Sequence, residues 1–188
     1  MTENCRRKKD PERVKAQIMT AAGHLAVLKG LSAITLEGVA REAGISKGGL
    51  LHHFPSRQNL LEDLYQEVLS RFSARIKATM AEDRESRGRF TRAYIRVTTA
   101  LPDTNFDSRL MASAVLVMSS NPALAELWSE WLESQLEING EGPDWLTGQI
   151  ARFAADGLWL ADGALAPGYL SSMRQAIIDR LIALTYQD

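Results

Sequence analysis

The sequence predicts an all-α protein of about nine helices, and two features of the chain support this fold class. Apolar residues recur at spacings of three and four over most of the 188 residues, as they do on one face of a helix. No segment sustains the alternation of apolar and polar residues that a half-buried strand requires. A hydrophobic content of 45% is enough for a core, so we expect the helices to pack into a globular protein.

The first helix is predicted between Pro11 and Gly30. Proline is favoured in the first turn of a helix, and glycine is favoured just beyond the last turn. Apolar residues recur between them with helical spacing, at Val14, Ile18, Ala21, Ala22, Leu25 and Leu28. We therefore expect this helix to supply the core of an N-terminal domain.

Residues 35–54 combine two short helical patterns around a tight turn, the arrangement of a helix-turn-helix. Thr35 is placed to cap the first helix, and Gly44 can adopt the left-handed conformation that ends it. Ser46 can cap a second helix, predicted from Lys47 to about His53. The turn is expected to fix the angle between the two helices.

The second of these helices contains two glycines, which lower its stability. Residues that destabilise a helix indicate that it serves as a binding surface and not only as a packing element. Gly48 and Gly49 each cost about 1 kcal/mol relative to alanine inside a helix. They would let the backbone approach another surface, and free N–H groups at a helix start suit a phosphate. Cationic or hydrogen-bonding side chains surround this element: Lys47, His52, His53 and Arg57. We predict that it enters the major groove of DNA, with a plain helical hairpin in a core as the alternative.

Charge is distributed unevenly along the chain. Residues 1–60 hold ten Lys or Arg and five Asp or Glu, a net charge of +5, which leaves −6 on the remainder because the whole chain carries −1. A basic N-terminal region steers that end of the protein toward a polyanion. The run Arg6-Arg7-Lys8-Lys9 is either an arm that touches DNA or a solubilising tail, and the sequence favours neither interpretation.

A long helix is predicted to connect the N-terminal domain to the rest of the chain. Ser56 can cap it after Pro55, and polar residues 82–89 end it. Its apolar stripe contains Leu60, Leu61, Leu64, Val68, Leu69, Phe72 and Ile76. About 25 residues would span roughly 37 Å, enough to carry a displacement between domains. The expected organisation is a basic arm at 1–10, a helix-turn-helix domain at 11–56 and a C-terminal domain at 57–188.

The N-terminal region resembles the DNA-binding domain of TetR-family transcriptional regulators. The resemblance rests on Thr35, Ala43-Gly44-Ile45-Ser46-Lys47-Gly48-Gly49-Leu50, His53-Phe54 and Ser56-Arg57. It implies an all-helical homodimer that represses, or less often activates, transcription, and a C-terminal domain that binds a small effector and thereby releases double-stranded operator DNA. It also implies DNA contact through Thr35, Ser46, Lys47, Gly48, Gly49, Leu50, His52, His53 and Arg57. Where family members commonly carry a phosphate-binding aromatic residue, this chain has Leu51 and His52.

The C-terminal domain is predicted to contain helices at about 90–101, 109–119, 122–138, 144–163 and 168–186. Aromatic and methionine side chains recur on them and would suit an apolar effector pocket: Phe106, Met111, Met118, Trp128, Trp131, Phe153 and Trp159. Such stripes also occur in ordinary cores, which is the alternative interpretation. The segment AADGLWLADG resembles TetR-family regulators linked to multidrug efflux, which implies a hydrophobic effector, cationic or neutral, with Asp156 or Asp162 as candidate counter-charges.

The last two predicted helices carry more apolar surface than one compact domain needs, which indicates a dimer interface. Small residues on the first of them allow close helix approach, and a twofold four-helix interface would bury the pair from each subunit. The candidate interface residues are Phe153, Gly157, Ala161, Met173, Ile177 and Leu181. Closure of the monomer's own core is the alternative use of the same residues.

Other classes of protein find little support in the sequence. The chain has no Cys-x-x-Cys, His-x-x-x-His, glycine-rich phosphate loop or Gly-x-Ser-x-Gly motif, so we expect no enzyme activity, metal or cofactor. An all-helical enzyme or a passive ligand carrier is the rival hypothesis. No apolar run is long enough to span a membrane and no signal peptide is evident, which predicts a cytoplasmic protein. The sequence therefore predicts a repressor that a hydrophobic small molecule releases from its operator.

Overall fold

The computed structural model describes residues 10–100, 121–161 and 172–186. Within these ranges it contains eight α-helices and one 3-10 helix, and no strand. The prediction of an all-α fold is confirmed. The helix expected at 109–119 lies outside the described residues. Among the helices that the structure describes, none is long and apolar enough to cross a membrane.

The N-terminal part, here called the head, consists of α1 (Pro11–Lys29), η1 (Leu31–Ala33), α2 (Leu36–Glu42) and α3 (Lys47–His53). Residues next to each α-helix cap it. The side chains of Asp10, Thr35 and Ser46 accept hydrogen bonds from backbone N–H groups three residues further on. Gly44, with φ of 66°, ends α2 in the left-handed conformation that favours glycine. The helix-turn-helix thus forms over the residues predicted for it.

A single apolar core holds the head together and continues into the neighbouring helices. Its fully buried residues include Ile18 of α1, Val39 of α2 and Leu50 of α3. Residues of the next helix along the chain join the same core, and so does Leu124, which comes from a helix some sixty residues further on. The head is therefore packed directly against elements of the C-terminal part.

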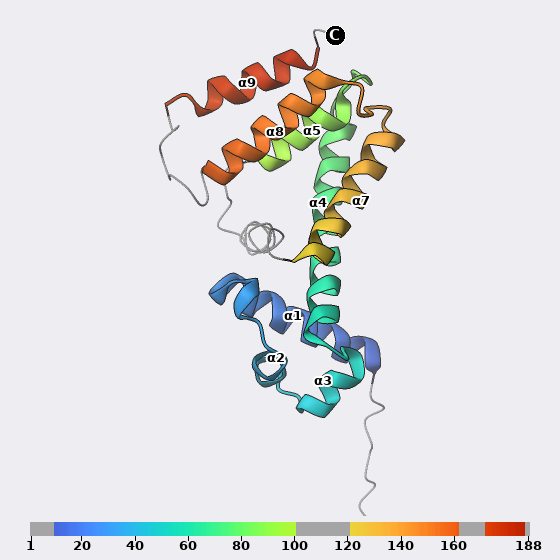
Figure 1. Cartoon of the computed structure of the whole chain (residues 1–188), viewed down its shortest axis with the longest axis vertical. Coiled ribbons are helices and arrows are strands. Elements are labelled where there is room, and N and C mark those ends of the chain that lie inside the picture. Colours follow the sequence, from blue (N-terminus) through green and yellow to red (C-terminus); the bar gives the residue numbers. More distant parts are fainter. Residues whose placement is uncertain (1–9, 101–120, 162–171, 187–188) are drawn as a thin grey trace, which may run out of the picture.

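One long helix, α4 (Arg57–Ala81), runs from the head at the bottom of Figure 1 into the C-terminal part of the molecule. Ser56 caps it by accepting a hydrogen bond from the N–H of Asn59 at 3.1 Å. An ion pair of 2.7 Å between Lys15 and Asp63 joins α1 to its first half. The 25 residues of α4 agree with the predicted length of the connecting helix.

The C-terminal part, here called the body, contains α5 (Arg89–Thr98), α7 (Pro122–Ile138), α8 (Leu146–Leu160) and α9 (Arg174–Leu184). Helices α5, α8 and α9 pack around one small apolar core, and α4, α5 and α7 pack around another. Figure 1 shows α7 lying along α4 and the α8–α9 pair extending to the other side of α5. The body therefore consists of two small cores that share α5.

Candidate DNA-binding surface and effector-binding region

Helix α3 turns a small, partly charged face to solvent. Lys47, Gly48, Leu51 and His52 are exposed. A Cβ atom on Gly48 would meet nothing within 4 Å, so the backbone is open to the outside at this residue. These residues form the outward face of the helix-turn-helix, and the DNA contact expected of Lys47, Gly48 and His52 stays a prediction.

Leu50 does not belong to this outward face, although the resemblance implied that it contacts DNA. Its side chain is 0% exposed and lies in the head core beneath α3. Thr35 and Ser46 are exposed, but both hydroxyls are occupied as helix caps, at 3.1 Å from the N–H groups of Gly38 and Gly49 respectively. Their part in DNA contact stays a prediction.

The two histidines of α3 lie against each other in an edge-to-face arrangement, with ring centroids 5.5 Å apart. His52 is exposed, while His53 is half-buried at the end of the helix. Of the two, His52 is the more exposed to solvent, and its contact with a phosphate stays a prediction.

Lys47 forms an ion pair with Glu37 of α2. The hydrogen bond from the Lys47 ammonium, followed by a backbone hydrogen bond and by charge attraction, lowers the pKa of the Glu37 carboxyl. The lysine that was predicted to bind phosphate therefore already has a carboxylate partner in the free protein.

Arg57 is engaged within the protein rather than extended toward a phosphate. Its Nε donates to the carbonyl oxygen of Ile34 at 2.7 Å, and its Nη2 donates to those of Leu31 and Ser32 at 3.1 Å each. These bonds tie the start of α4 to η1 and the segment after it. Three backbone carbonyls thus hold Nε and Nη2 of the guanidinium group, and the phosphate contact of Arg57 stays a prediction.

An aromatic cluster lies between α4, α5 and α7, and two predicted effector-pocket residues belong to it. Trp128 and Trp131 of α7 lie at a tilt to each other with centroids 5.0 Å apart, and both contact Phe72 of α4 with centroids at 5.4–6.0 Å. Phe90 and Tyr94 of α5 complete the cluster. Both tryptophans pack against the head core and against the core shared by α4, α5 and α7, so the aromatic cluster joins these two cores.

Of the remaining predicted pocket residues, the two that the structure describes, Phe153 and Trp159, do not belong to this cluster. Phe106, Met111 and Met118 lie outside the described residues. Phe153 is 70% exposed on the outer face of α8, and Trp159 is half-buried near the end of the same helix. Their assignment to an effector pocket stays a prediction for all five.

A half-buried acid lies beside the aromatic cluster. The hydroxyl of Tyr94 donates to Asp156 of α8 at 2.6 Å. Burial raises the pKa of the Asp156 carboxyl to about 6, and the Tyr94 hydrogen bond and the positive charge of Arg152 only partly oppose this shift. Of the two predicted counter-charges, Asp156 is described and Asp162 is not. Tyr94 was missed, although its spacing of four residues from Phe90 on one helix was a usable signal.

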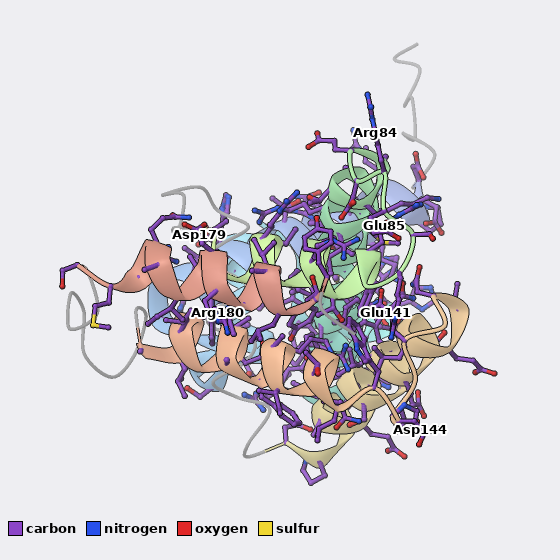
Figure 2. All side chains as sticks on the ribbon, turned by 90° about the horizontal axis from the view of Figure 1, so that it is seen from above. Arg84, Glu85, Glu141, Asp144, Asp179 and Arg180 are labelled. Atoms are coloured by element: carbon purple, nitrogen blue, oxygen red, sulfur yellow. The ribbon has the colours of Figure 1, made fainter. Side chains whose placement is uncertain are left out.

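A second polar group, also missed from the sequence, holds the far end of the body together. Glu141, in the loop between α7 and α8 labelled in Figure 2, is 3% exposed. Its carboxylate accepts hydrogen bonds from the N–H groups of Phe90 and Thr91 at 2.8 and 2.9 Å, and from the Thr91 hydroxyl at 2.6 Å. The buried guanidinium of Arg152 lies 4.0 Å from it. Glu141 thus caps α5, whose own N-cap residue, Gly88, provides no side-chain hydrogen bond.

The candidate dimer residues fall on two different faces of α8 and α9. Phe153 and Met173 are 70% and 61% exposed, and Gly157 is also exposed. Leu181 is only 6% exposed and Ile177 is half-buried, and both pack into the core shared by α5, α8 and α9. Leu181 is therefore a core residue of the monomer, and its prediction as an interface residue is wrong because it points toward its own chain. Ala161 is half-buried.

An apolar stripe follows the outer face of α8. Leu146 and Ile150 are 66% and 53% exposed, and with Phe153 they recur at helical spacing along one side. Sequence reasoning did not include Leu146, because exposed and buried apolar positions on a helix have the same periodicity.

Comparisons with known proteins match both parts of the chain. Residues 18–64 match the family model described as bacterial regulatory proteins, tetR family, and residues 88–186 match the tetracyclin repressor-like, C-terminal domain. The chain is 32% identical over 154 residues to the HTH-type transcriptional regulator BetI 1 of Chromohalobacter salexigens, covering 73% of this chain and 72% of that protein. It is 22% identical over 174 residues to the HTH-type transcriptional repressor KstR2 of Mycobacterium tuberculosis, covering 84% and 87%.

Among solved structures, the multidrug binding protein EbrR complexed with malachite green is similar, with a TM-score of 0.69. The match covers 91% of this chain and 98% of that one at 20% sequence identity. Its fold is therefore shared with the chain described here.

Proposed function

The chain belongs to the TetR family of bacterial transcriptional regulators, and from this premise we propose that it is a repressor that a hydrophobic small molecule releases from its operator. Regulators of this family bind operator DNA, act as dimers and bind small-molecule effectors. In this proposal, residues 11–56 bind DNA, residues 57–188 bind the effector and form the dimer, and residues 1–10 add sequence-independent affinity.

The observation that carries the proposal is the position of α7, which contacts both halves of the connecting helix. At its start, Leu124 is buried in the head-side core, and Asn121 exchanges two amide hydrogen bonds of 3.1 and 3.4 Å with Gln58 in the first turn of α4. One to two turns later, Trp128 and Trp131 contact the middle of α4. A ligand that displaces α7 must therefore also displace the helix that carries the head.

The proposed effector lies in the body beside the aromatic cluster. Aromatic faces and the methionines predicted for the pocket suit a flat hydrophobic molecule. Asp156, when ionised, would favour a cation, and the Tyr94 hydroxyl gives it an orienting partner. Swinging α4 would move the two recognition helices of a dimer away from the spacing of successive major grooves, so that the DNA is released.

The proposed dimer forms through the outer face of α8. Leu146, Ile150 and Phe153 provide exposed apolar surface, and the exposed Gly157 lets a second helix approach closely. Helix α9 contributes Met173. Phe153→Glu would place a charge at the centre of this contact, and sedimentation should then show monomers while the protein remains folded.

Binding to genomic DNA tests the proposed function directly. Fragments retained by the protein at low salt would identify a candidate operator, and malachite green, the ligand of the EbrR complex, is a suitable first effector probe. We expect the dye to quench tryptophan fluorescence and to weaken operator binding. By linkage, a tenfold loss of operator affinity requires tenfold weaker dye binding to the complex, a coupling of about 1.4 kcal/mol. A protein that retains no fragment, or whose dye affinity is the same with and without operator, would contradict the proposal.

A further inference from the structure

The single lysine of α3 is already neutralised in the free protein. Lys47 is the first residue of α3, and its ammonium group pairs with the carboxylate of Glu37 in the first turn of α2. The two side chains are 56% and 62% exposed, so solvent and any bound nucleic acid can reach the pair. The pair therefore lies on the surface that the helix-turn-helix offers to DNA.

An ammonium group that binds a DNA phosphate releases counterions and adds affinity for any sequence. A carboxylate on the same ammonium competes with the phosphate, and it also brings a negative charge toward the DNA backbone. We propose, on the basis of the DNA-binding function above, that Glu37 restrains the sequence-independent DNA affinity of the head by competing with phosphate for Lys47. Glu37 is in this sense a positioning residue, since it acts through Lys47.

The surroundings of the pair favour competition over a purely structural role. The first turns of α2 and α3 do not need the Lys47–Glu37 pair, because Thr35 caps α2 and Ser46 caps α3. Exposed ion pairs contribute little to folding stability. The free energy of such a pair, if it must be broken when DNA binds, corresponds to about a two- to fivefold change in DNA affinity. Removing Glu37 should therefore leave the head folded and free the lysine.

The test measures binding to a labelled duplex of mixed sequence, which requires no knowledge of the operator. Fluorescence anisotropy between 50 and 200 mM salt would compare wild type, Glu37→Gln, Glu42→Gln and the double variant Glu37→Gln/Lys47→Met. Glu42 is the matched control because it is an exposed acid at the other end of α2, and its loss changes the net charge equally. Thermal melting checks that each variant is folded.

We expect Glu37→Gln to bind about two- to fivefold more tightly than Glu42→Gln, and its slope of log affinity against log salt to steepen by about 0.9. Adding Lys47→Met should return both quantities to the wild-type values. Equal affinities of the Glu37 and Glu42 variants would overturn the inference. So would a double variant that keeps the gain, because the gain would then come from removing a carboxylate and not from freeing Lys47. A wild-type protein that binds no duplex at 50 mM salt would overturn the proposed DNA-binding function, and this inference with it.

Discussion

The head and the body are held together in different ways. Each α-helix of the head is capped by the side chain of the residue that precedes it, and the interior beneath these helices is an apolar core. The body also has apolar cores, but it adds side-chain hydrogen bonds between distant residues, such as Glu141 with Thr91 and Asp156 with Tyr94. A domain whose helices are capped by neighbouring residues presents a fixed surface. A domain whose helices are joined by ionisable side chains away from solvent can change its packing when one of these groups changes charge or when a ligand binds. This difference suits a protein in which a DNA-binding domain is joined to an effector-binding domain.

The largest expected effect follows from removing Glu141. Its loss in Glu141→Ala would leave the buried N–H groups of Phe90 and Thr91 without an acceptor and the Arg152 guanidinium without its carboxylate. Breaking such a buried pair costs about 3–5 kcal/mol of unfolding free energy. Chemical denaturation would measure it, with Glu137→Ala, an exposed acid of α7, as the control. Equal stability of the two variants would mean that the body does not depend on this long-range cap.

The next effect is a pH dependence that belongs to the body. Asp156 has a pKa of about 6 in the folded protein against its ordinary value of 3.8, so the folded state binds the proton more tightly than the unfolded state does. The contribution of this carboxyl to stability therefore falls as the pH rises from about 4 to about 6, and it is lowest above that range. Two pKa units correspond to roughly 3 kcal/mol.

Asp156→Asn should remove this pH dependence. The unfolding free energy of wild type minus that of the variant should fall between about pH 4 and pH 6–7 by some 2–3 kcal/mol and then remain constant. Asp144→Asn, a change at an exposed loop residue, is the control and should give a constant difference. A flat difference for Asp156→Asn as well would show that the carboxyl is not desolvated by its surroundings.

Arg57 makes polar contacts with head residues that are distant in the sequence. Its removal therefore tests whether the head also depends on long-range hydrogen bonds. Arg57→Ala would leave the carbonyl oxygens of Leu31, Ser32 and Ile34 without this donor, at a cost of about 1.5–3 kcal/mol in unfolding free energy. Arg41→Ala removes an equal charge from an exposed residue of α2 and should cost less than 0.5 kcal/mol. If Arg57→Ala melts like wild type but binds DNA more weakly, the side chain serves a phosphate and not the loop.

The same difference explains how much could be predicted from the sequence. Thr35, Gly44 and Ser46 act within a few residues of their own positions, so the helix-turn-helix could be derived with its boundaries. Glu141 and Thr91 are fifty residues apart, and no local pattern signals that one caps the helix of the other. Leu181 and Phe153 both continue an apolar helical period, but only packing decides that the first faces its own core and the second faces outward. Arg57 was predicted as a cation near DNA, because its sequence neighbours do not reveal the three carbonyls that bind it.

The smallest expected change in stability concerns the contact between the two regions, where Asn121 of α7 meets Gln58 of α4. Asn121→Ser keeps a side chain that can cap α7 but is too short to exchange amide hydrogen bonds with Gln58, so stability should fall by less than about 1 kcal/mol. The coupling between effector and DNA should weaken more clearly, by about 0.5–1.4 kcal/mol, or roughly two- to tenfold in the ratio of dye affinities without and with operator. Asn139→Ser, at the opposite end of α7, should leave that ratio unchanged because the Asn139 amide donates to the carbonyl of Gln135 at its own helix end and not to α4. If Asn121→Ser keeps the full coupling, the displacement of α7 must reach the head through the apolar contacts of Leu124 and the tryptophans, and the amide pair serves only to fix where α7 begins.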